Sequence, residues 1–562
     1  MALLQEYTNN FRNYFSREKA LIIGQSSSSQ KFAMRLRSLQ YDVHYVVRAP
    51  KTADCSALED AGVDIKVIDG EGNVSRYRKS VKRCSYLIIA TESDVLNIDI
   101  LGELLSDIQR KSESRLNVIV SIKNPKTRGL MVDQTQKLSS KYGLKLRFFD
   151  PRHEFAKAIY DRFPPFRFVH TSTVANQSKC IAIVGSNDIA HRFVEENIVL
   201  SHFPDEKLRL LLISQNAADE VKELQFRLPH LTSFLELIAI EWQNSAFSEI
   251  EDWPGGLHEH LSSVDVLYCF GQQDSEVMAV ALRVKQMIYT QRECLTEVPV
   301  VACLPEDSHL FDLLEKTQIG YKEETQLAKM KSDFGLHVMR QYSDGIDVDR
   351  FINPNDPIEV VARVVNYFYS VSYEFPEMLK THFRKNSASD FTKNLADKLL
   401  SFDCKNHAPL GQIEALILSH LVKYTGSSIY KLKTLFGIEE RWEQISQRAK
   451  ESNRYVARDL KAQASHLKAL GVTNFGEAFT GRAYDVLSKL IHDRWMAEKL
   501  NADFTYGVLP EKNRKLKGTL KNELKIHDMI IPYDSLSAFE KGKDADMLKM
   551  IPLLLRVHAA CD

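Results

Sequence analysis

Two segments of this sequence carry residues that could bind a phosphorylated ligand. The first, LIIGQSSSSQKFAMRLRSL over residues 21–39, reads as an apolar strand, a turn and an amphipathic helix. A dinucleotide-binding loop places three glycines here, for the turn, for close approach of the pyrophosphate and for helix packing. This chain has Gly24, Ser26 and Ser29 at those positions. A serine in a left-handed conformation costs about 1 kcal/mol, but serines also cap helices and donate to phosphate. We expect the loop geometry to be disfavoured without being excluded.

Arg48 ends the second apolar run, where a typical NAD site has an acid that holds the ribose hydroxyls. An arginine there suits a phosphorylated ligand, and equally a solvated surface. A second copy of the loop, GSNDIAHRF, has Gly185, Asn187 and Ala190 at the three positions, and Asp188 would repel phosphate. We interpret the second copy as a non-binding scaffold. For the first copy, nucleotide binding and a loop that has lost it both stay open.

The second segment lies near the C-terminus and combines aromatic rings with basic side chains. Helical spacing predicts one buried face and places Arg494 on the exposed side; the face consists of Tyr484, Leu487, Ile491 and Trp495. Stacking faces and phosphate contacts for a nucleotide would come from Trp495, Phe504, Tyr506 and Tyr533 and from Arg494, Lys499, Arg514 and Lys515. Core packing of the rings and a solvated basic loop are the alternatives.

Two series of short apolar runs would position these residues. The runs begin at residues 20, 43, 65, 86, 117 and 146, and again at 180, 208, 235, 264, 298 and 335. Such runs are typical of parallel strands buried on both faces, and the gaps leave room for crossover helices. The predicted fold class is α/β, with two doubly wound Rossmann-like units in tandem. A mainly helical C-terminal domain follows, entered by a helix with Asp356 as N-cap and Pro357 at its first position.

Composition limits the classes of function. The formal net charge of the 562 residues is 0, which argues against a general binder of nucleic acid or anionic membranes but not against local basic patches. The eight cysteines form no CxxC pair, so we expect a reducing cytoplasm and no metal site. No apolar run reaches the roughly 20 residues of a membrane span, and the polar N-terminus predicts no signal peptide. No catalytic motif is present, and we expect no enzyme.

The first predicted unit resembles the nucleotide-binding RCK (TrkA-N) domain of potassium channels and transporters. The resemblance rests on VIDGEGNVSRYRKSVKRCSYLIIATESDVLNIDI, in which Asp69, Thr91, Asp94 and Asn97 fall on characteristic positions. It implies a domain that sits in dimers or rings beside a membrane pore. It also implies a nucleotide site at Gly24, Ser26, Ser29, Arg48, Asp69, Thr91 and Asn97, although the glycine loop departs from the family pattern.

The C-terminal segment resembles a prokaryotic ryanodine-receptor repeat (RyR) domain over about residues 440–556. The matching motifs occur in order: His492, Trp495 and Lys499, then Tyr506-Gly507, then Pro532, Tyr533, Leu536, Glu540 and Lys541, and a closing Ile551-Pro552 helix. Phe504 replaces the usual tryptophan. The resemblance implies a ligand-binding module, best supported for adenine nucleotides, with Arg494, Trp495, Lys499, Phe504, Tyr506, Arg514, Lys515, Pro532 and Tyr533 at its site.

These observations predict a cytoplasmic ligand sensor that can lie beside a membrane partner. We expect a linker-like segment at 1–18, α/β domains at 19–165 and 178–372, a helical linker at 373–439 and the RyR-like domain at 440–562. Its ligand would be an adenine nucleotide or dinucleotide, its state a homo-oligomer, and its partner a membrane channel or effector rather than nucleic acid. The alternatives are an NAD(P)-dependent oxidoreductase that uses the first unit, and an oligomeric scaffold without a ligand.

Overall fold

The computed structural model describes sixteen segments of the chain: residues 18–48, 55–68, 78–81, 83–105, 116–169, 179–204, 206–241, 260–261, 263–291, 298–304, 336–340, 345–379, 385–403, 408–472, 481–510 and 517–561. Contacts divide the chain into two compact units. The first comprises residues 1–154 with the short segments 346–352 and 446–448, and the second comprises the remainder. Most of the predicted N-terminal linker, residues 1–17, lies outside the described residues.

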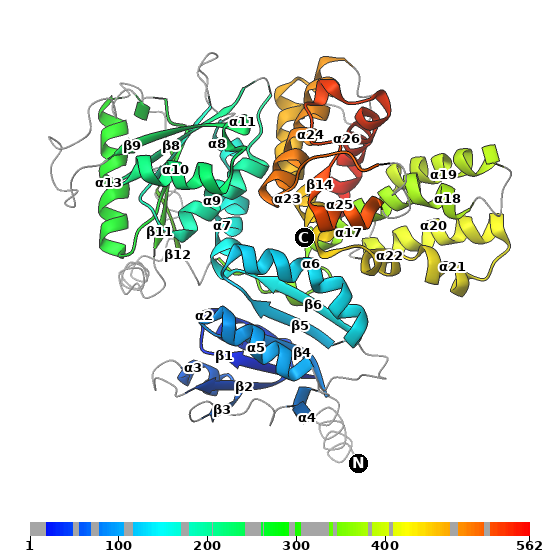
Figure 1. Cartoon of the computed structure of the whole chain (residues 1–562), viewed down its shortest axis with the longest axis horizontal. Helices are drawn as coiled ribbons and strands as arrows, with labels where there is room; N and C mark the ends of the chain where they lie inside the picture. Colours follow the sequence, from blue (N-terminus) through cyan, green and yellow to red (C-terminus); the bar gives the residue numbers. More distant parts are fainter. Residues whose placement is uncertain are drawn as a thin grey trace, which may run out of the picture. The chain divides into compact units, whose positions relative to one another are not determined.

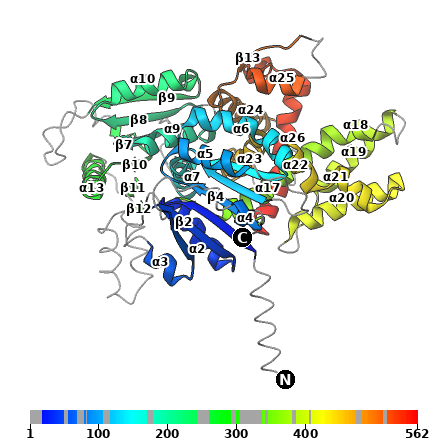
Figure 2. The same cartoon turned by 60° about the horizontal axis from the view of Figure 1, so that its bottom comes forward.

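The first unit contains a parallel sheet in the order β3-β2-β1-β4-β5-β6 (Figure 1). Its strands are β1 (Lys19–Gly24), β2 (Asp42–Arg48), β3 (Asp64–Ile68), β4 (Cys84–Ala90), β5 (Leu116–Ser121) and β6 (Leu144–Phe149). Helices α2 (Ser27–Ser38) and α3 (Ser56–Asp60) cover one face (Figure 2), and α5 (Asp94–Leu105) and α6 (Pro125–Tyr142) cover the other. The strand order reverses beside β1, which is the doubly wound Rossmann arrangement.

The second unit repeats this winding in the order β12-β11-β10-β7-β8-β9. Its strands are β7 (Cys180–Val184), β8 (Leu208–Ser214), β9 (Leu235–Glu241), β10 (Val266–Cys269), β11 (Val300–Leu304) and β12 (Leu336–Arg340). Helices α9 (Asp188–Leu200) and α10 (Ala217–Arg227) pack on one face and α13 (Asp274–Gln291) on the other. Every predicted apolar run therefore overlaps a strand. The central strands, such as β7, are buried along their whole length because helices cover both faces, whereas the edge strand β9 is only partly buried.

The C-terminal part of the second unit is mainly helical. Its helices include α17 (Pro357–Tyr369), α19 (Lys385–Leu400), α20 (Pro409–Thr425), α21 (Ile429–Phe436), α22 (Ile438–Gln444), α23 (Gln447–Ala469), α24 (Arg482–Asn501), α25 (Lys517–Leu524) and α26 (Ala538–Ala559). Asp356 caps α17 by accepting from the Glu359 N–H, with Pro357 in the first turn, as predicted. The predicted α/β class with a helical C-terminal domain is confirmed. Among the described helices, none is both long and apolar enough to cross a bilayer.

Candidate functional site

The turn between β1 and α2 brings two strand ends of the first sheet close together. A Cβ atom added to Gly24 would lie 2.1 Å from the Ala90 carbonyl oxygen at the end of β4, so only glycine fits. The β1–β4 boundary is where the strand order reverses. In open parallel sheets, ligands bind at this switch point, outside the carboxyl ends of the strands.

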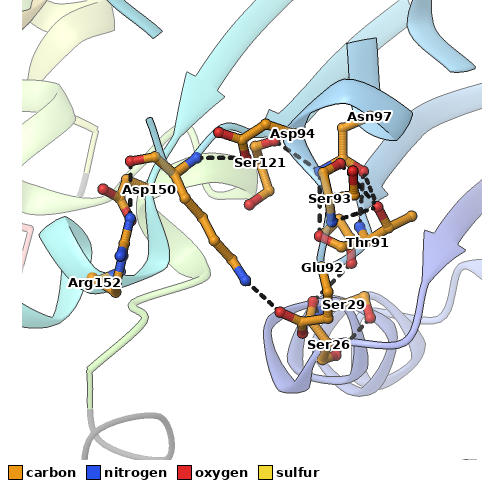
Figure 3. Close-up of polar contacts among 12 residues, drawn as sticks. Ser26, Ser29, Thr91, Glu92, Ser93, Asp94, Asn97, Ser121, Asp150 and Arg152 are labelled. Atoms are coloured by element: carbon orange, nitrogen blue, oxygen red, sulfur yellow. Dashed lines mark hydrogen bonds and ion pairs between the residues drawn. The ribbon is translucent and has the colours of Figure 1, made fainter. Parts of the chain in front are cut away.

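Ser26 occupies the second glycine position without strain. Its backbone is extended (φ −77°, ψ 154°) rather than left-handed, so the expected conformational cost is absent at this serine. The hydroxyl donates to the Ala90 carbonyl at 2.8 Å and accepts from the Ser29 N–H at 3.2 Å (Figure 3). Ser26 is thus the N-cap of α2, which a glycine could not be through a side chain.

Ser29, at the third glycine position, is buried where the helix packs on the sheet. Its hydroxyl donates to the Ser26 carbonyl at 2.6 Å and shares a 2.6 Å hydrogen bond with the Tyr45 hydroxyl. Neighbouring Ser28 is 1% exposed, and the described residues provide no hydrogen-bond partner for its hydroxyl. The N–H groups of Ser27 and Ser28 belong to the first helical turn, where N–H groups have no intrahelical acceptor. The start of α2 can therefore donate to an anion.

On the other side of the switch point, Asn97 holds the chain that follows β4 by hydrogen bonds (Figure 3). Its buried amide accepts from the Thr91 N–H at 2.9 Å and the Thr91 hydroxyl at 2.7 Å, and it donates to the carbonyls of Thr91 and Ser121. Asp94 accepts from the N–H groups of Lys123 and Asn124 at 2.8 and 2.7 Å. Asn97 and Asp94 therefore hold the chain that follows β4 and β5. The side-chain amide of Asn97 is used in these hydrogen bonds, so its role is to position the loop after β4.

The remaining predicted residues of this site are placed only in part. Arg48 is the last residue of β2 and is paired with Ile68 of β3, but its side chain lies outside the described residues. Asp69 lies outside them altogether. Their contacts with a ribose or a phosphate stay predictions. Ser28 is not among the residues predicted for this site. It stands in a run of four serines, and the sequence alone does not distinguish it from the other three.

The corresponding loop of the second sheet is built differently. Gly185 has a left-handed φ of +83°, and an added Cβ would lie 2.0 Å from the Phe270 carbonyl oxygen. Asn187 caps α9, and its side-chain oxygen accepts from both the Ile189 and the Ala190 N–H groups. Asp188 stands at the first helical position. Two of the first-turn donors are occupied by the cap and a carboxylate is present, so this loop suits a scaffold better than a phosphate site.

The C-terminal aromatic patch, defined here as Trp495, Lys499, Phe504, Tyr506 and His527, surrounds the end of α24. Trp495 is half-buried and its ring centroid lies 4.9 Å from that of His527. The Lys499 ammonium lies 5.9 Å from the ring centroids of both Trp495 and Phe504. Phe504 is buried, whereas Tyr506 is 59% exposed. The patch therefore offers one exposed ring, Tyr506, and two half-buried rings, Trp495 and His527, with the Lys499 ammonium near Trp495.

Arg494 does not lie on the exposed side of α24, and that prediction is wrong. Its side chain is 4% exposed and lies near Glu498 (3.4 Å) and Asp459 (3.8 Å). The buried face of α24 includes Leu487, Ile491, Arg494 and Glu498. Arg494 therefore lies on the face that packs on the core, and Trp495 lies at the edge of that face.

Of the other residues predicted to bind a ligand here, one is exposed, one is buried, and two lie outside the described residues. Pro532 is exposed, and Tyr533 is buried beside it. Arg514 and Lys515 lie outside the described residues, so their phosphate contacts stay predictions.

Buried charges follow α23, in the segment KESNRYVARDL. Arg454 binds both carboxylate oxygens of Glu359, at 2.6 and 3.1 Å. Arg458 binds Asp161 at 2.9 Å and Glu196 at 2.5 Å, and the Glu196 side chain is fully buried. These pairs join α23 to α7 (Pro151–Arg162), α9 and α17. The sequence gives no sign of them, because each partner is more than ninety residues away.

Comparisons with known proteins add no family. No family model and no curated protein matches the chain. Among solved structures, the chain is similar to the crystal structure of one of the subunits of dipicolinate synthase from Bacillus halodurans, at 9% identity and a TM-score of 0.20. That match covers 57% of this chain and 88% of the other. The fold assignment rests on the two strand orders, and no argument about ligand or activity is drawn from this likeness.

His492 predicts a pH-dependent stability of the C-terminal helices. Burial lowers its pKa, but the carboxylate of Asp544 (3.6 Å) and the carbonyl of Ile531 (2.8 Å) outweigh burial and raise the pKa above its usual value. A raised folded-state pKa stabilises the fold below the unfolded pKa of about 6.5, and this stabilisation is lost as pH rises through the folded pKa. Urea unfolding followed by tryptophan fluorescence should show stability falling from pH 6 to pH 8.

The variant His492→Gln isolates this effect. Glutamine retains a donor for the Ile531 carbonyl but carries no charge beside Asp544. The difference in unfolding free energy between wild type and variant should therefore shrink as pH rises. A difference that stays constant between pH 6 and pH 8 would contradict protonation of His492 as its cause.

Proposed function

We propose that the chain is a nucleotide-responsive regulatory protein whose first sheet binds a ligand phosphate at the start of α2. The contrast between its two equivalent loops carries this proposal. The first loop has Ser27 at the first helical position and first-turn N–H groups without intrahelical acceptors, and the described residues give the buried Ser28 hydroxyl no partner. The second loop fills the same place with Asp188 and the Asn187 cap.

The ligand class follows from this geometry. A helix N-terminus with unsatisfied N–H groups favours a phosphate, and the Rossmann switch point places the rest of a nucleotide along the strand ends. Arg48 ends the neighbouring strand β2, where its charge would suit a further phosphate. An adenine nucleotide or dinucleotide is therefore the ligand to test first, and the C-terminal aromatic patch is a second surface on which a base could stack.

A regulatory role is favoured over catalysis by how the polar groups beside the switch point are used. Asn97 and Asp94 hold backbone groups, and Glu92 pairs with Lys123. Farther along the edge, buried Asp150 pairs with Arg128 at 2.9 Å. These described side chains support loops rather than converge on a reacting atom. The nucleotide would act as a signal passed to a partner, such as a channel or effector, by a homo-oligomer of this chain.

Replacing Ser27 with aspartate should weaken nucleotide binding by about 2 kcal/mol, roughly thirtyfold in Kd, because a carboxylate would take the place of the phosphate. An acid in the first turn favours the helix, so the fold should be retained. The measurement is titration calorimetry of the full chain with ATP, ADP, AMP, NAD, NADP and a cyclic dinucleotide. The matched control is Asp188→Ser at the equivalent position of the second loop, which should leave the Kd unchanged.

Other outcomes would redirect the proposal. A Kd weakened by Trp495→Ala and not by Ser27→Asp would move the site to the C-terminal aromatic patch. Turnover of NADH or NADPH, detected by nicotinamide absorbance with a substrate panel, would favour the oxidoreductase. Binding of none of these nucleotides by the full chain would contradict the proposal and favour a scaffold without a ligand.

A further inference from the structure

The hairpin of α20 and α21 ends in a compact, well-anchored tip. Gly426, with a left-handed φ of +66°, ends α20, and Ser428 caps α21 by accepting from the Lys431 N–H. Buried Leu421 and Leu432 hold the two helices to the helical core. The two helices lie side by side in Figure 1 and Figure 2. The orientation of the tip residues is therefore fixed by packing below them.

The tip exposes large apolar side chains. Tyr430 is 82% exposed, Ile429 59%, Tyr424 56% and Leu435 42%. The Tyr424 ring packs against Phe391 of α19, with 4.3 Å between centroids and 57° between the ring planes, which holds it in place at the surface. Four such residues within twelve positions form a dense exposed apolar group of the described chain. The buried leucines of the hairpin already pack it on the helical core, so these exposed apolar side chains are not needed for that packing.

The tip is also cationic. Its hairpin carries Lys423, Lys431 and Lys433 against a single acid, Glu414, in a chain whose formal net charge is 0. Glu414 pairs with Lys433 at 3.1 Å and accepts from the Ile438 N–H at 3.0 Å. Lys423 and Lys431 are exposed and flank the two tyrosines and the isoleucine. The charge excess therefore lies at the apolar tip itself.

We propose that the α20–α21 tip docks on the surface of an anionic lipid bilayer. Tyrosine rings are favoured at the interface of membrane and water, and isoleucine can enter the acyl boundary. Lysines beside them are attracted to anionic headgroups. A protein partner of standard size needs about 800 Å² of complementary surface, which a group of four exposed apolar side chains does not provide. A bilayer requires no such complementarity.

The test is co-sedimentation of the full chain with vesicles of phosphatidylcholine alone or with about 30 mol% phosphatidylglycerol. We expect binding only to the anionic vesicles, and binding that weakens as salt is raised from about 50 to 500 mM. The double variant Ile429→Ser, Tyr430→Ser should reduce the bound fraction by about fivefold or more at limiting lipid, because it removes the most exposed apolar groups. Lys423→Glu with Lys431→Glu should reduce it similarly.

The matched control is Phe226→Ser, which removes an 84% exposed ring from α10, outside the hairpin. It should bind vesicles like the wild type. Circular dichroism and tryptophan fluorescence should show all variants folded. Absence of binding to anionic vesicles, equal binding of the hairpin variants, or equal loss in Phe226→Ser would overturn the proposal. Nucleotide binding is measured separately, and Ser27→Asp should leave vesicle binding unchanged.

Discussion

Replacing Arg458 with methionine should destabilise the second unit by about 3–5 kcal/mol, because it removes the guanidinium that pairs with the fully buried Glu196 carboxylate. Glu196 is fully buried and depends on Arg458 at 2.5 Å, with Tyr455 as a further donor at 3.0 Å. Asp161 would lose its 2.9 Å bond to the same guanidinium. Methionine fills much of the volume, so the loss reflects charge rather than a cavity.

Tryptophan fluorescence isolates this effect. The four tryptophans, at positions 242, 253, 442 and 495, all belong to the second unit. Urea unfolding followed at this signal should show a lower midpoint for Arg458→Met. The control Arg209→Met removes a partly exposed cation 3.4 Å from exposed Glu236, and should cost less than about 1 kcal/mol. Equal losses in both variants would contradict the special role of the buried cluster.

A triple variant separates the charge from the packing. Replacing Arg458, Glu196 and Asp161 together with apolar residues of similar size should recover much of the stability, because no buried charge would be left unpaired. Failure to recover would mean that the cluster contributes through geometry that apolar residues cannot reproduce.

The strands were predictable because their physics is local. Central strands covered on both faces, such as β1, β4 and β7, are apolar along almost their whole length, and edge strands such as β9 still keep an apolar majority, so each run stands out from its own residues. The cap of α17 is equally local, since Asp356 and Pro357 act on the next turn. Such features need no knowledge of the rest of the fold.

Features that depend on partners distant in the sequence could not be predicted from it. Arg494 was placed by the periodicity of its own helix, but two stripes one residue apart fit nearly as well, and Asp459 on α23 decides between them. Likewise, Phe351 packs on Phe32 of α2 and on Phe149 of β6, with ring centroids 5.6 and 5.3 Å apart. No local pattern indicates that this short segment returns across some two hundred residues.

The candidate phosphate loop was predicted in position but not in conformation. The comparison with a glycine loop predicts an energetic cost for serines in a left-handed backbone conformation. The backbone of Ser26 is instead extended, and Ser26 is the N-cap of α2. The sequence cannot distinguish these two cases, because the acceptor that orients the Ser26 hydroxyl is the Ala90 carbonyl, on another strand.

Replacing Gly24 with alanine should destabilise the first unit by about 3 kcal/mol and abolish the nucleotide binding proposed for this loop. The new Cβ would lie 2.1 Å from the Ala90 carbonyl oxygen and 2.6 Å from its carbon, so β1 and β4 must separate at their ends. Backbone atoms of two central strands cannot yield as a side-chain tip would, and overpacking of this kind costs about 1–3 kcal/mol or more. The displaced Ala90 carbonyl would also lose the Ser26 hydroxyl that orients the start of α2.

The same substitution at Gly102 should have the opposite sign. Gly102 lies inside α5 with no atom within 4 Å of an added Cβ, so alanine should stabilise this helix by about 0.5–1 kcal/mol. Far-UV circular dichroism reports both units, whereas tryptophan fluorescence reports only the second. Gly24→Ala should therefore lower the dichroism midpoint while the fluorescence midpoint stays. A shift of both signals, or of neither, would mean that the β1–β4 contact does not limit the stability of the first unit in the way its geometry requires.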